Sequence, residues 1–400
     1  MKSTSRRTFL QKTCLAGVAG VSLGCAPAQR GGRRTTKRWK TSGVVATLPP
    51  EKRVYRDEKT GREVWQMTRG KAPSLTCYME AEALTEDERY TVFCSNRTGR
   101  FEVYRADVDS GEIAQLSDIP GLRGESPVAM ERNGREAIYT DGWRIFATDV
   151  ATGETRMVAD LEKTIPNPIP EVPRSFSGSG DRCVITYERE DGNNSLGIVF
   201  MKTGEFHEVF RGNSDLAHPQ LCPGDPNLIT FVPLPDTQND MNLPMEQRAR
   251  SWICDTATGQ ARPFLIVPYG FRATHEYWDY RGDRLYFHKK SKPGWTPTTI
   301  SSINRAGEDW QDHYESQDRK LGHSSIDRTG QFIVSDVQQR GDNELYRIDL
   351  KTGSSEILCW PNTSGDTHVH PSISARGRYA YFASNRTGVA HVYLCPLVRQ

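Results

Sequence analysis

The sequence predicts an all-β protein, a seven-bladed β-propeller in one domain. Glycine turns recur along it at intervals of roughly 40 to 55 residues, which is the size of one four-stranded blade. The segments between these turns are rich in β-branched and aromatic residues, as strands are, and no long helical periodicity competes with them. The composition also suits a turn-rich β protein, because the 400 residues include 34 Gly, 23 Pro and 8 Trp.

Each glycine turn is expected to connect the last two strands of a blade. The motif from Phe93 to Gly99 returns near the C-terminus as Phe382 to Gly388, which indicates that the repeat spans the chain. The turns with this pattern are Ser110-Gly111, Thr152-Gly153, Thr203-Gly204, Thr258-Gly259, Ala306-Gly307 and Thr352-Gly353.

The repeat predicts six complete blades and one incomplete blade. The six complete units begin near Tyr78, Glu125, Arg174, His218, His275 and His323. A seventh unit begins at His370 and ends after three strands, at Leu394. The segment Thr60 to Thr68 has the form of a glycine turn followed by a last strand, and we expect this N-terminal strand to join the C-terminal blade and close the ring. The alternative, an open stack of sheets, leaves that strand unexplained.

The N-terminus has the features of an export signal. Ser5 to Leu10 resembles a twin-arginine motif, and Ser22 to Cys25 resembles a lipobox that would attach a lipid anchor to Cys25. The domains expected are a signal over 1–25, a basic linker over 26–54 and a propeller over 55–400. The protein would then be periplasmic or a membrane-anchored lipoprotein, whereas a basic tail without a targeting role is the alternative.

Charge and cysteine content exclude several classes of protein. The 52 Lys and Arg residues are balanced by 50 Asp and Glu residues, which argues against nucleic-acid binding. No apolar stretch of about 20 residues follows the N-terminal segment, so no membrane-spanning helix is predicted there. Seven cysteines follow Cys25, and their spacing fits neither a zinc site nor a disulfide scaffold, so we interpret them as small buried residues.

Histidines recur at one position of the repeat. His218, His275, His323 and His370 each stand at the start of a unit, where the first strand of a blade begins at one mouth of the channel. His368 lies two residues before His370, so both side chains point the same way in an extended strand. Converging neutral imidazoles favour a metal site, although local turn chemistry inherited by each repeat would also place them there. The remaining histidines fall elsewhere in the repeat and are expected to be structural: His207, His288, His313 and His391.

At these histidines the sequence resembles the oligogalacturonate lyases, polysaccharide lyase family 22. The resemblance covers roughly residues 55 to 397, and its motifs occur in the same order and at the same point of each blade. The matching stretches are Gly61 to Val64, His218-Pro219, Pro223-Gly224-Asp225, Thr274-His275-Glu276-Tyr277-Trp278, Gly322-His323 and Thr367-His368-Val369-His370-Pro371-Ser372.

The resemblance implies a seven-bladed propeller that holds a divalent metal, manganese in that family, and eliminates across a 4-linked galacturonate. It places the metal on His275, His368 and His370 and the Brønsted base on His218. The base would take the proton from C5, and the bond to O4 would break. The residue types suit this chemistry, because a cation on the carboxylate stabilises a carbanion-like transition state and a neutral imidazole is a suitable base near pH 7.

The sequence departs from the family pattern at two positions. Gly365 stands where the family has a metal-binding glutamine, although the neighbouring Asp366 offers an oxygen. Ser195 stands near the place of the family's catalytic arginine, and Arg189 or Arg174 would have to reach the site from nearby. Of the two, we expect Arg189 to be the catalytic arginine.

Substrate contacts are expected from His323 and Trp278, with Trp278 and Tyr277 as a stacking platform beside His275. Packing between blades is the alternative for both aromatic residues. The polar insertion from Leu234 to Arg250 is expected to overhang the mouth near His218. The partner implied is an acidic oligosaccharide.

Two other functions are compatible with a propeller. The Phe93 and Phe382 motifs also resemble the strand motif of TolB-type propellers, which bind proteins without catalysis, but that repeat predicts no set of histidines. A propeller glycosidase would need two carboxylates facing each other across the mouth, and Glu125, Glu276 and Asp279 are available. A fused peptidase is excluded, since no Gly-x-Ser-x-Gly motif follows the repeats.

Overall fold

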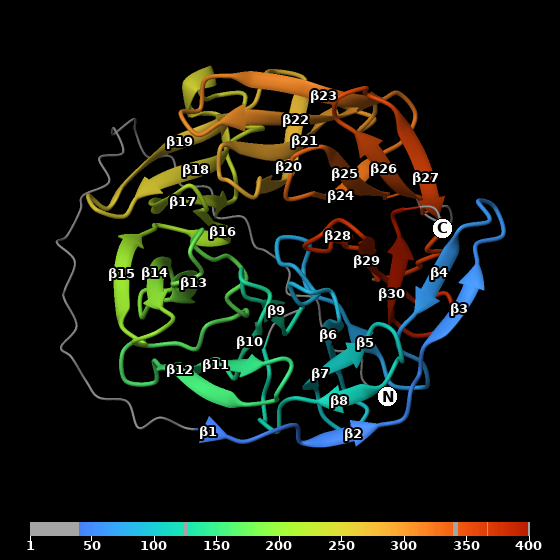
Figure 1. Ribbon diagram of the computed structural model, residues 1–400. Helices are drawn as coiled ribbons and strands as arrows, with labels where there is room; N and C mark the ends of the chain where they lie inside the picture. Colours follow the sequence, from blue (N-terminus) through green and yellow to red (C-terminus); the bar gives the residue numbers. More distant parts are fainter. Residues whose placement is uncertain (1–39, 124–125, 339–342, 366, 399–400) are drawn as a thin grey trace, which may run out of the picture.

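The computed structural model describes residues 40–123, 126–338, 343–365 and 367–398. Seven antiparallel sheets surround a central axis, each with its first strand innermost (Figure 1). The predicted all-β seven-bladed propeller is therefore confirmed. The export signal and Cys25 lie outside the described residues.

Blades 1 to 3 come from the first half of the chain. The strands of blade 1 are β5 (Ser74–Leu75), β6 (Tyr90–Ser95), β7 (Glu102–Asp107) and β8 (Ile113–Gln115). Those of blade 2 are β9 (Ala129–Met130), β10 (Glu136–Thr140), β11 (Arg144–Asp149) and β12 (Thr155–Asp160). Blade 3 contains β13 (Arg182–Glu188), β14 (Asn194–Phe200) and β15 (Phe206–Arg211), and a bridge between Phe176 and Cys183 stands in for its inner strand.

Blades 4 to 6 have four strands each. Blade 4 contains β16 (Asp215–Cys222), β17 (Asp225–Leu234), β18 (Ala249–Asp255) and β19 (Gln260–Ile266), with a short 3-10 helix, η1 (Met245–Gln247), before β18. Blade 5 contains β20 (Phe271–Trp278), β21 (Arg284–Ser291), β22 (Thr298–Asn304) and β23 (Trp310–Ser316). Blade 6 contains β24 (Leu321–Ile326), β25 (Phe332–Val337), β26 (Leu345–Asp349) and β27 (Ser355–Cys359).

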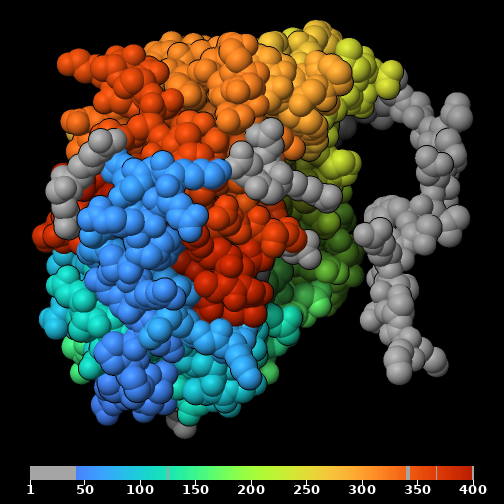
Figure 2. Space-filling view, turned by 90° about the vertical axis from the view of Figure 1, so that its right-hand side faces the viewer, coloured from blue at the N-terminus to red at the C-terminus, as the bar shows by residue number. Residues whose placement is uncertain are grey.

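Blade 7 joins the two ends of the chain. Its inner strands are β28 (Ser372–Ile373), β29 (Tyr379–Ser384) and β30 (His391–Pro396), and its outer strands are β4 (Glu63–Gln66) and β3 (Arg53–Arg56). Strand β4 pairs with β30 through Trp65 opposite Leu394 and Gln66 opposite Tyr393. The N-terminal segment lies directly against the C-terminal blade in Figure 2. The predicted closure of the ring by an N-terminal strand is confirmed.

The segment expected to be a linker up to residue 54 also forms strands. β1 (Lys40–Thr41) extends blade 2 beside β12, and β2 (Ala46–Leu48) extends blade 1 beside β8. An exposed strand edge has unpaired backbone groups, and these short strands satisfy them. The propeller therefore begins at Lys40 rather than at residue 55.

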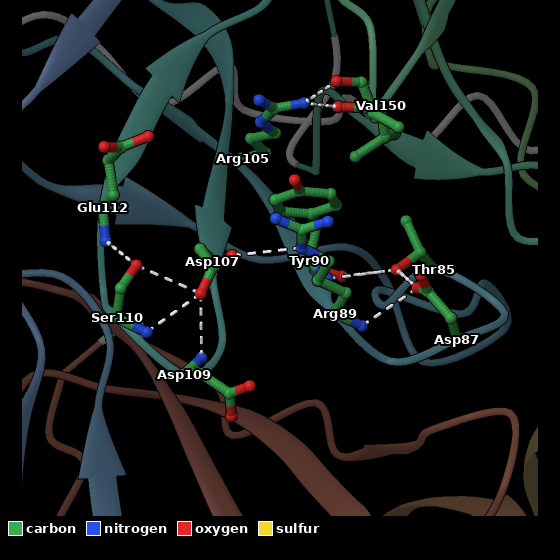
Figure 3. A network of polar contacts seen from close by, with 11 residues as sticks. Thr85, Asp87, Arg89, Tyr90, Arg105, Asp107, Asp109, Ser110, Glu112 and Val150 are labelled. Carbon is green, nitrogen blue, oxygen red and sulfur yellow. Dashed lines mark hydrogen bonds and ion pairs between the residues drawn. The ribbon is translucent and has the colours of Figure 1, made fainter.

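An aspartate organises the repeated glycine turn, as Figure 3 shows for blade 1. The carboxylate of Asp107 accepts hydrogen bonds from the backbone of Asp109 and from both the backbone and the hydroxyl of Ser110. Gly111 then takes a positive φ of 78°, which a glycine adopts without steric cost. The same aspartate-centred turn recurs at Asp57/Thr60, Asp149/Thr152, Asp255/Thr258 and Asp349/Thr352.

The core lies between and within the blades, and it contains the seven cysteines. All seven cysteines after Cys25 are buried, as the sequence predicted. Within the described residues, no helix has the length and apolar character needed to cross a membrane.

Candidate functional site

Irregular backbone at the start of the inner strands directs the repeated histidines. His218, His275 and His370 have positive φ angles of 49°, 55° and 44°, a region that residues other than glycine seldom occupy. In β16 and β20, the strand register shifts where the histidine stands, as in a β-bulge. Such strained positions concentrate at functional sites, where a bulge changes the direction of a side chain.

Four histidines from blades 5, 6 and 7 converge at one mouth of the channel. His323 is central, because its ring centroid lies 4.2 Å from that of His275, 4.3 Å from His370 and 5.5 Å from His368. The ligand atoms of His323, His368 and His370 lie within 4.8 Å of one another, close enough to hold one ion. Three imidazoles are a donor set that divalent ions such as Zn²⁺ accept, so the residues fit a divalent metal.

Neighbouring groups fix the orientation of two of these rings. Asp336 lies 3.0 Å from Nδ1 of His323 and also accepts the backbone N–H of His323. The carbonyl of Gly322 lies 2.7 Å from Nδ1 of His275. Each contact engages Nδ1 and leaves Nε2 of the ring for a metal, which is the usual arrangement around ligating histidines. The amide of Gln338, 3.4 Å from Nδ1 of His323, is also at this site.

The environment keeps two of the histidines neutral. Burial lowers the pKa of His275 well below its usual range, and the neighbouring His323 and Lys290 add to this effect. Burial and His323 lower the pKa of His370 in the same way. Neutral imidazoles are the form that binds metals, so the site is prepared for a cation at neutral pH.

Replacing Gly322 with alanine should damage the site and the fold together. A Cβ atom on Gly322 would overlap the side chains of Gln338 and Asp336, so the substitution should lower stability by about 1–3 kcal/mol and weaken metal binding. Urea denaturation and metal titration measure the two effects. Gly294→Ala is the control, because a Cβ there has no neighbour within 4 Å; equal effects of both substitutions would contradict the prediction.

His218 lies across the channel from this cluster, beside a buried carboxylate. Oε1 of Glu80 is 3.6 Å from Nδ1 of His218, and Glu80 also receives Nε of Arg174 at 3.1 Å and the amide of Gln220. Burial alone would raise the pKa of Glu80, but Arg174 and His218 outweigh burial and the net pKa is lowered. Glu80 therefore stays ionised and contacts the Nδ1 side of His218, which leaves Nε2 outside this contact.

Tyr78 connects the two halves of the site. Its ring centroid lies 4.8 Å from that of His370 and 6.1 Å from that of His218, and the Arg174 guanidinium stacks over it at 4.2 Å. Tyr78 and Glu80 belong to the irregular segment between β5 and Leu84, which enters the channel. The site is thus one continuous group of residues from six blades.

Arg189 lies in the hairpin between β13 and β14. Its guanidinium bonds to Asp191, to the carbonyls of Asn194 and Gly212, and to the Ser195 hydroxyl at 3.3 Å. Arg189 therefore lies beside Ser195 in blade 3, whereas Arg174 is the arginine that contacts Glu80 and Tyr78.

The structure places His323 and Trp278 differently from their expected roles in substrate contact. His323 is 3% exposed and belongs to the metal-binding group. Trp278 packs in the core, with its ring 6.0 Å from Phe264 and its indole N–H donating to Thr230. The register shift between Thr274 and Tyr277 breaks the alternation of side chains, so the sequence did not reveal which way Trp278 points.

The insertion from Leu234 to Arg250 is anchored beside His275. The side chain of Gln238 exchanges two hydrogen bonds with the backbone of Ala273, two residues before His275. Arg250 bonds to Asp236 and Glu276, and all three side chains are almost fully buried. The insertion is therefore anchored beside His275, and its first residue, Leu234, pairs with Asp215, three residues before His218.

A cavity of about 120 Å³ lies further along the inner strands, beyond the histidines. Its lining includes Glu80, Arg174, Arg328 and Asp279. Asp279 accepts backbone N–H groups of its own turn, and Oε2 of Glu276 is paired with Arg250, so both carboxylates have structural partners. Glu125 lies outside the described residues.

Lys290 is buried in blade 5, and its charge opposes folding. Burial lowers the pKa of Lys290 to about 8, Lys320 lowers it further, and Asp336 partly offsets this. The unfolded chain binds this proton up to a pH of about 10.5, so folding is penalised below pH 8 and the penalty fades between pH 8 and 10.5.

Replacing Lys290 with methionine should therefore stabilise the protein at pH 7 by up to about 3 kcal/mol. The gain should shrink as the pH rises from 8 to 10.5, which thermal unfolding at several pH values measures. Lys351→Met, at an exposed turn, should have no such effect. A loss of stability in Lys290→Met at pH 7 would show that the amine supports the fold.

Sequence reasoning missed Tyr78 as a site residue, and Glu80, Asp336 and Gln338 altogether. Tyr78 was recognised only as the start of a blade. Asp336 and Gln338 lie at the end of β25, and no local motif marks them. The one available signal was position in the repeat. Glu80 follows Tyr78, the start of its unit, by two residues, and Gln220 follows His218, the start of its unit, by the same number.

Comparisons with known proteins identify the fold. No protein-family model and no curated protein sequence matches the chain. Among solved structures, an oligogalacturonate lyase in complex with manganese matches with a TM-score of 0.77 and 20% identity, covering 90% of this chain and 99% of that one. An oligogalacturonate lyase from Vibrio parahaemolyticus gives 0.75 and 18% over the same shares. The propeller domain of Cps50 (Swd1) from Myceliophteria thermophila gives 0.51 and 12%, covering 83% of this chain and 99% of that one. The likeness that the motifs predicted is confirmed for the fold: this chain has the seven-bladed propeller fold of the oligogalacturonate lyases.

Proposed function

We propose that this protein is a divergent oligogalacturonate lyase, which cleaves short oligogalacturonides by metal-dependent β-elimination. One observation carries the proposal: a histidine held by a carboxylate, His218, faces a cluster of metal-binding histidines around the same tyrosine, Tyr78. The likeness to the manganese complex of an oligogalacturonate lyase supports it.

His218 is the base in this proposal. Its Nε2 takes the proton from C5 of the galacturonate, the electron pair forms the C4–C5 double bond, and the bond to O4 breaks. Glu80 orients the ring through Nδ1 and stabilises the imidazolium that forms. Arg189 would neutralise the substrate carboxylate, with Arg174 as the alternative.

The metal would be held by His323, His368 and His370, with His275 beside them. Gln338 offers an amide in a site where the glutamine expected at residue 365 is a glycine. When bound, a divalent cation such as Mn²⁺ lowers the energy of the negative charge that develops on the uronate.

The experiment follows the ultraviolet absorbance of the unsaturated uronide with digalacturonate as substrate. Absorbance should rise with the wild-type protein and Mn²⁺, fall to background after chelation, and stay at background with His218→Ala. His207→Ala is the control, because His207 is on the outer part of blade 3. Equal product from wild type and His218→Ala would reject His218 as the base.

A non-catalytic, TolB-like binding propeller is the second candidate. The glycine at 365 and the serine at 195 favour it, since both replace residues that the family uses for chemistry. Absence of product from digalacturonate, together with intact metal binding, would favour this candidate over the lyase.

The proposal includes export, on the basis of the motif from Ser5 to Leu10 and the lipobox at Cys25. Replacing Arg6 and Arg7 with lysine should retain the protein in the cytoplasm, as cell fractionation measures. Cys25→Ser should release a lipid-anchored form from the membrane, and an unchanged distribution would show that no anchor is attached.

A further inference from the structure

A group of cations without matching carboxylates lies beside the metal-binding histidines. The group, here called the cation cluster, consists of Arg250, Arg272, Lys290 and Lys320. Arg272 and Lys290 stand directly opposite each other on β20 and β21. Like charges in cross-strand pairs destabilise a sheet, so a counterion is expected there.

The carboxylates nearby do not balance the cluster. Asp236 and Glu276 both bind Arg250, and Asp236 is 4.0 Å from Arg272. A third carboxylate, Asp336, is engaged by His323. Asp336 also faces Lys290, so three carboxylates face four cations. Arg250 and Lys290 are almost fully buried, where unpaired charge is costly, whereas Arg272 is 33% exposed.

Several polar atoms here also have no hydrogen-bond partner. Among the described residues, Nε of Arg272, Oγ1 of Thr274, Nδ1 of His288 and the carboxylate oxygen Oε1 of Glu276 are buried and unsatisfied. Buried polar groups in proteins are almost always satisfied, so such a concentration beside one mouth indicates a bound polar ligand or water. The excess positive charge makes an anion the expected ligand.

Trp295 holds two of the cations toward the mouth. The Arg272 guanidinium lies 5.5 Å from the ring centroid of Trp295, and Nζ of Lys320 lies 5.0 Å from it. Arg272 precedes His275 by three residues and Lys320 precedes His323 by three, which is about 10 Å along a strand. An anion bound here is therefore within the length of a short oligosaccharide from the metal ligands.

We infer that Arg272, Lys290 and Lys320 form a subsite for the carboxylate of a second uronate residue in the same substrate chain. This inference rests on the proposed function for its ligand, an acidic oligosaccharide, but not on the elimination step. The subsite makes the protein select oligomers over single uronates, because only an oligomer reaches both the metal ligands and the cation cluster.

The test measures binding by calorimetry to metal-loaded protein in the His218→Ala background, where turnover does not consume the ligand. Trigalacturonate should bind more tightly than galacturonate. Adding Lys320→Met or Arg272→Met should weaken trigalacturonate binding at least about tenfold, as for the loss of one charge-assisted contact. Galacturonate and methyl-esterified trigalacturonate should bind the parent and these variants equally. Lys351→Met, in the exposed turn after β26, is the matched control.

Each outcome of these binding measurements either supports or overturns the proposed subsite. Unchanged trigalacturonate affinity in Lys320→Met and Arg272→Met, or no binding to the parent, would overturn the subsite. An equal loss of affinity for galacturonate in these variants would also overturn the subsite, because the cations would then act on the metal site itself. The wild type could fail to form unsaturated product while the parent still binds trigalacturonate more tightly than the cation variants do. That result would reject the lyase reaction and support the subsite.

Discussion

Replacing His323 with alanine should abolish tight binding of a divalent metal. His323 is the hub of the cluster, with three other histidine rings within 5.5 Å and its own Nδ1 fixed by Asp336. Even indirect partners of metal ligands change affinity by about 10- to 100-fold, so loss of this imidazole should cost at least about 100-fold. Calorimetric titration with Mn²⁺ and mass-spectrometric metal analysis measure this loss.

The same metal titration distinguishes between two possible sets of metal ligands. The resemblance assigned the metal to His275, His368 and His370, whereas the closest set of ligand atoms belongs to His323, His368 and His370. His275→Ala should therefore weaken metal binding less than His323→Ala does. The opposite order would support His275, His368 and His370 as the metal ligands. His207→Ala is the control and should leave the affinity for the metal unchanged.

Replacing Arg250 with methionine should have the largest effect on stability. Arg250 is 8% exposed, and its removal leaves the buried carboxylates of Asp236 and Glu276 without their cation. Breaking a buried ion pair from one side costs about 3–5 kcal/mol, because the remaining charge is left uncompensated. Urea denaturation should show this as a lower free energy of unfolding.

Two further variants test the cause. Arg211→Met removes a cation that is 61% exposed and paired with Glu208, and should cost less than about 1 kcal/mol. Adding Asp236→Asn and Glu276→Gln to Arg250→Met should recover much of the loss. If Arg250→Met were no more harmful than Arg211→Met, the buried network would not contribute to stability.

The fold could be predicted from the sequence because its signals are local. The turn at Asp107, Ser110 and Gly111 is stabilised by contacts within five residues, so it is visible in any single repeat. The histidines were found for the same reason, since each occupies the same position of its own repeat.

The rest of the site depends on contacts between distant blades. Glu80 meets His218 across 138 positions of sequence, and its segment departs from a regular strand, so no periodicity revealed it. The strands over 40–54 were missed because their role is to cover the edges of other blades. These strands are too short for an alternation of apolar and polar residues to be recognised. Their position is explained by the strand edges with which they pair.

The pairing of β4 with β30 also determines when the site is complete. Gln66 and Tyr393 come from opposite ends of the chain, so their contact closes a very long loop and carries a high entropic cost. His368 and His370 precede the inner strands of that same last blade. During synthesis they emerge after His275 and His323, and β4 cannot join blade 7 until β30 follows them. Assembly of the histidine cluster therefore coincides with completion of the ring, and a bound metal would stabilise only chains that have finished folding.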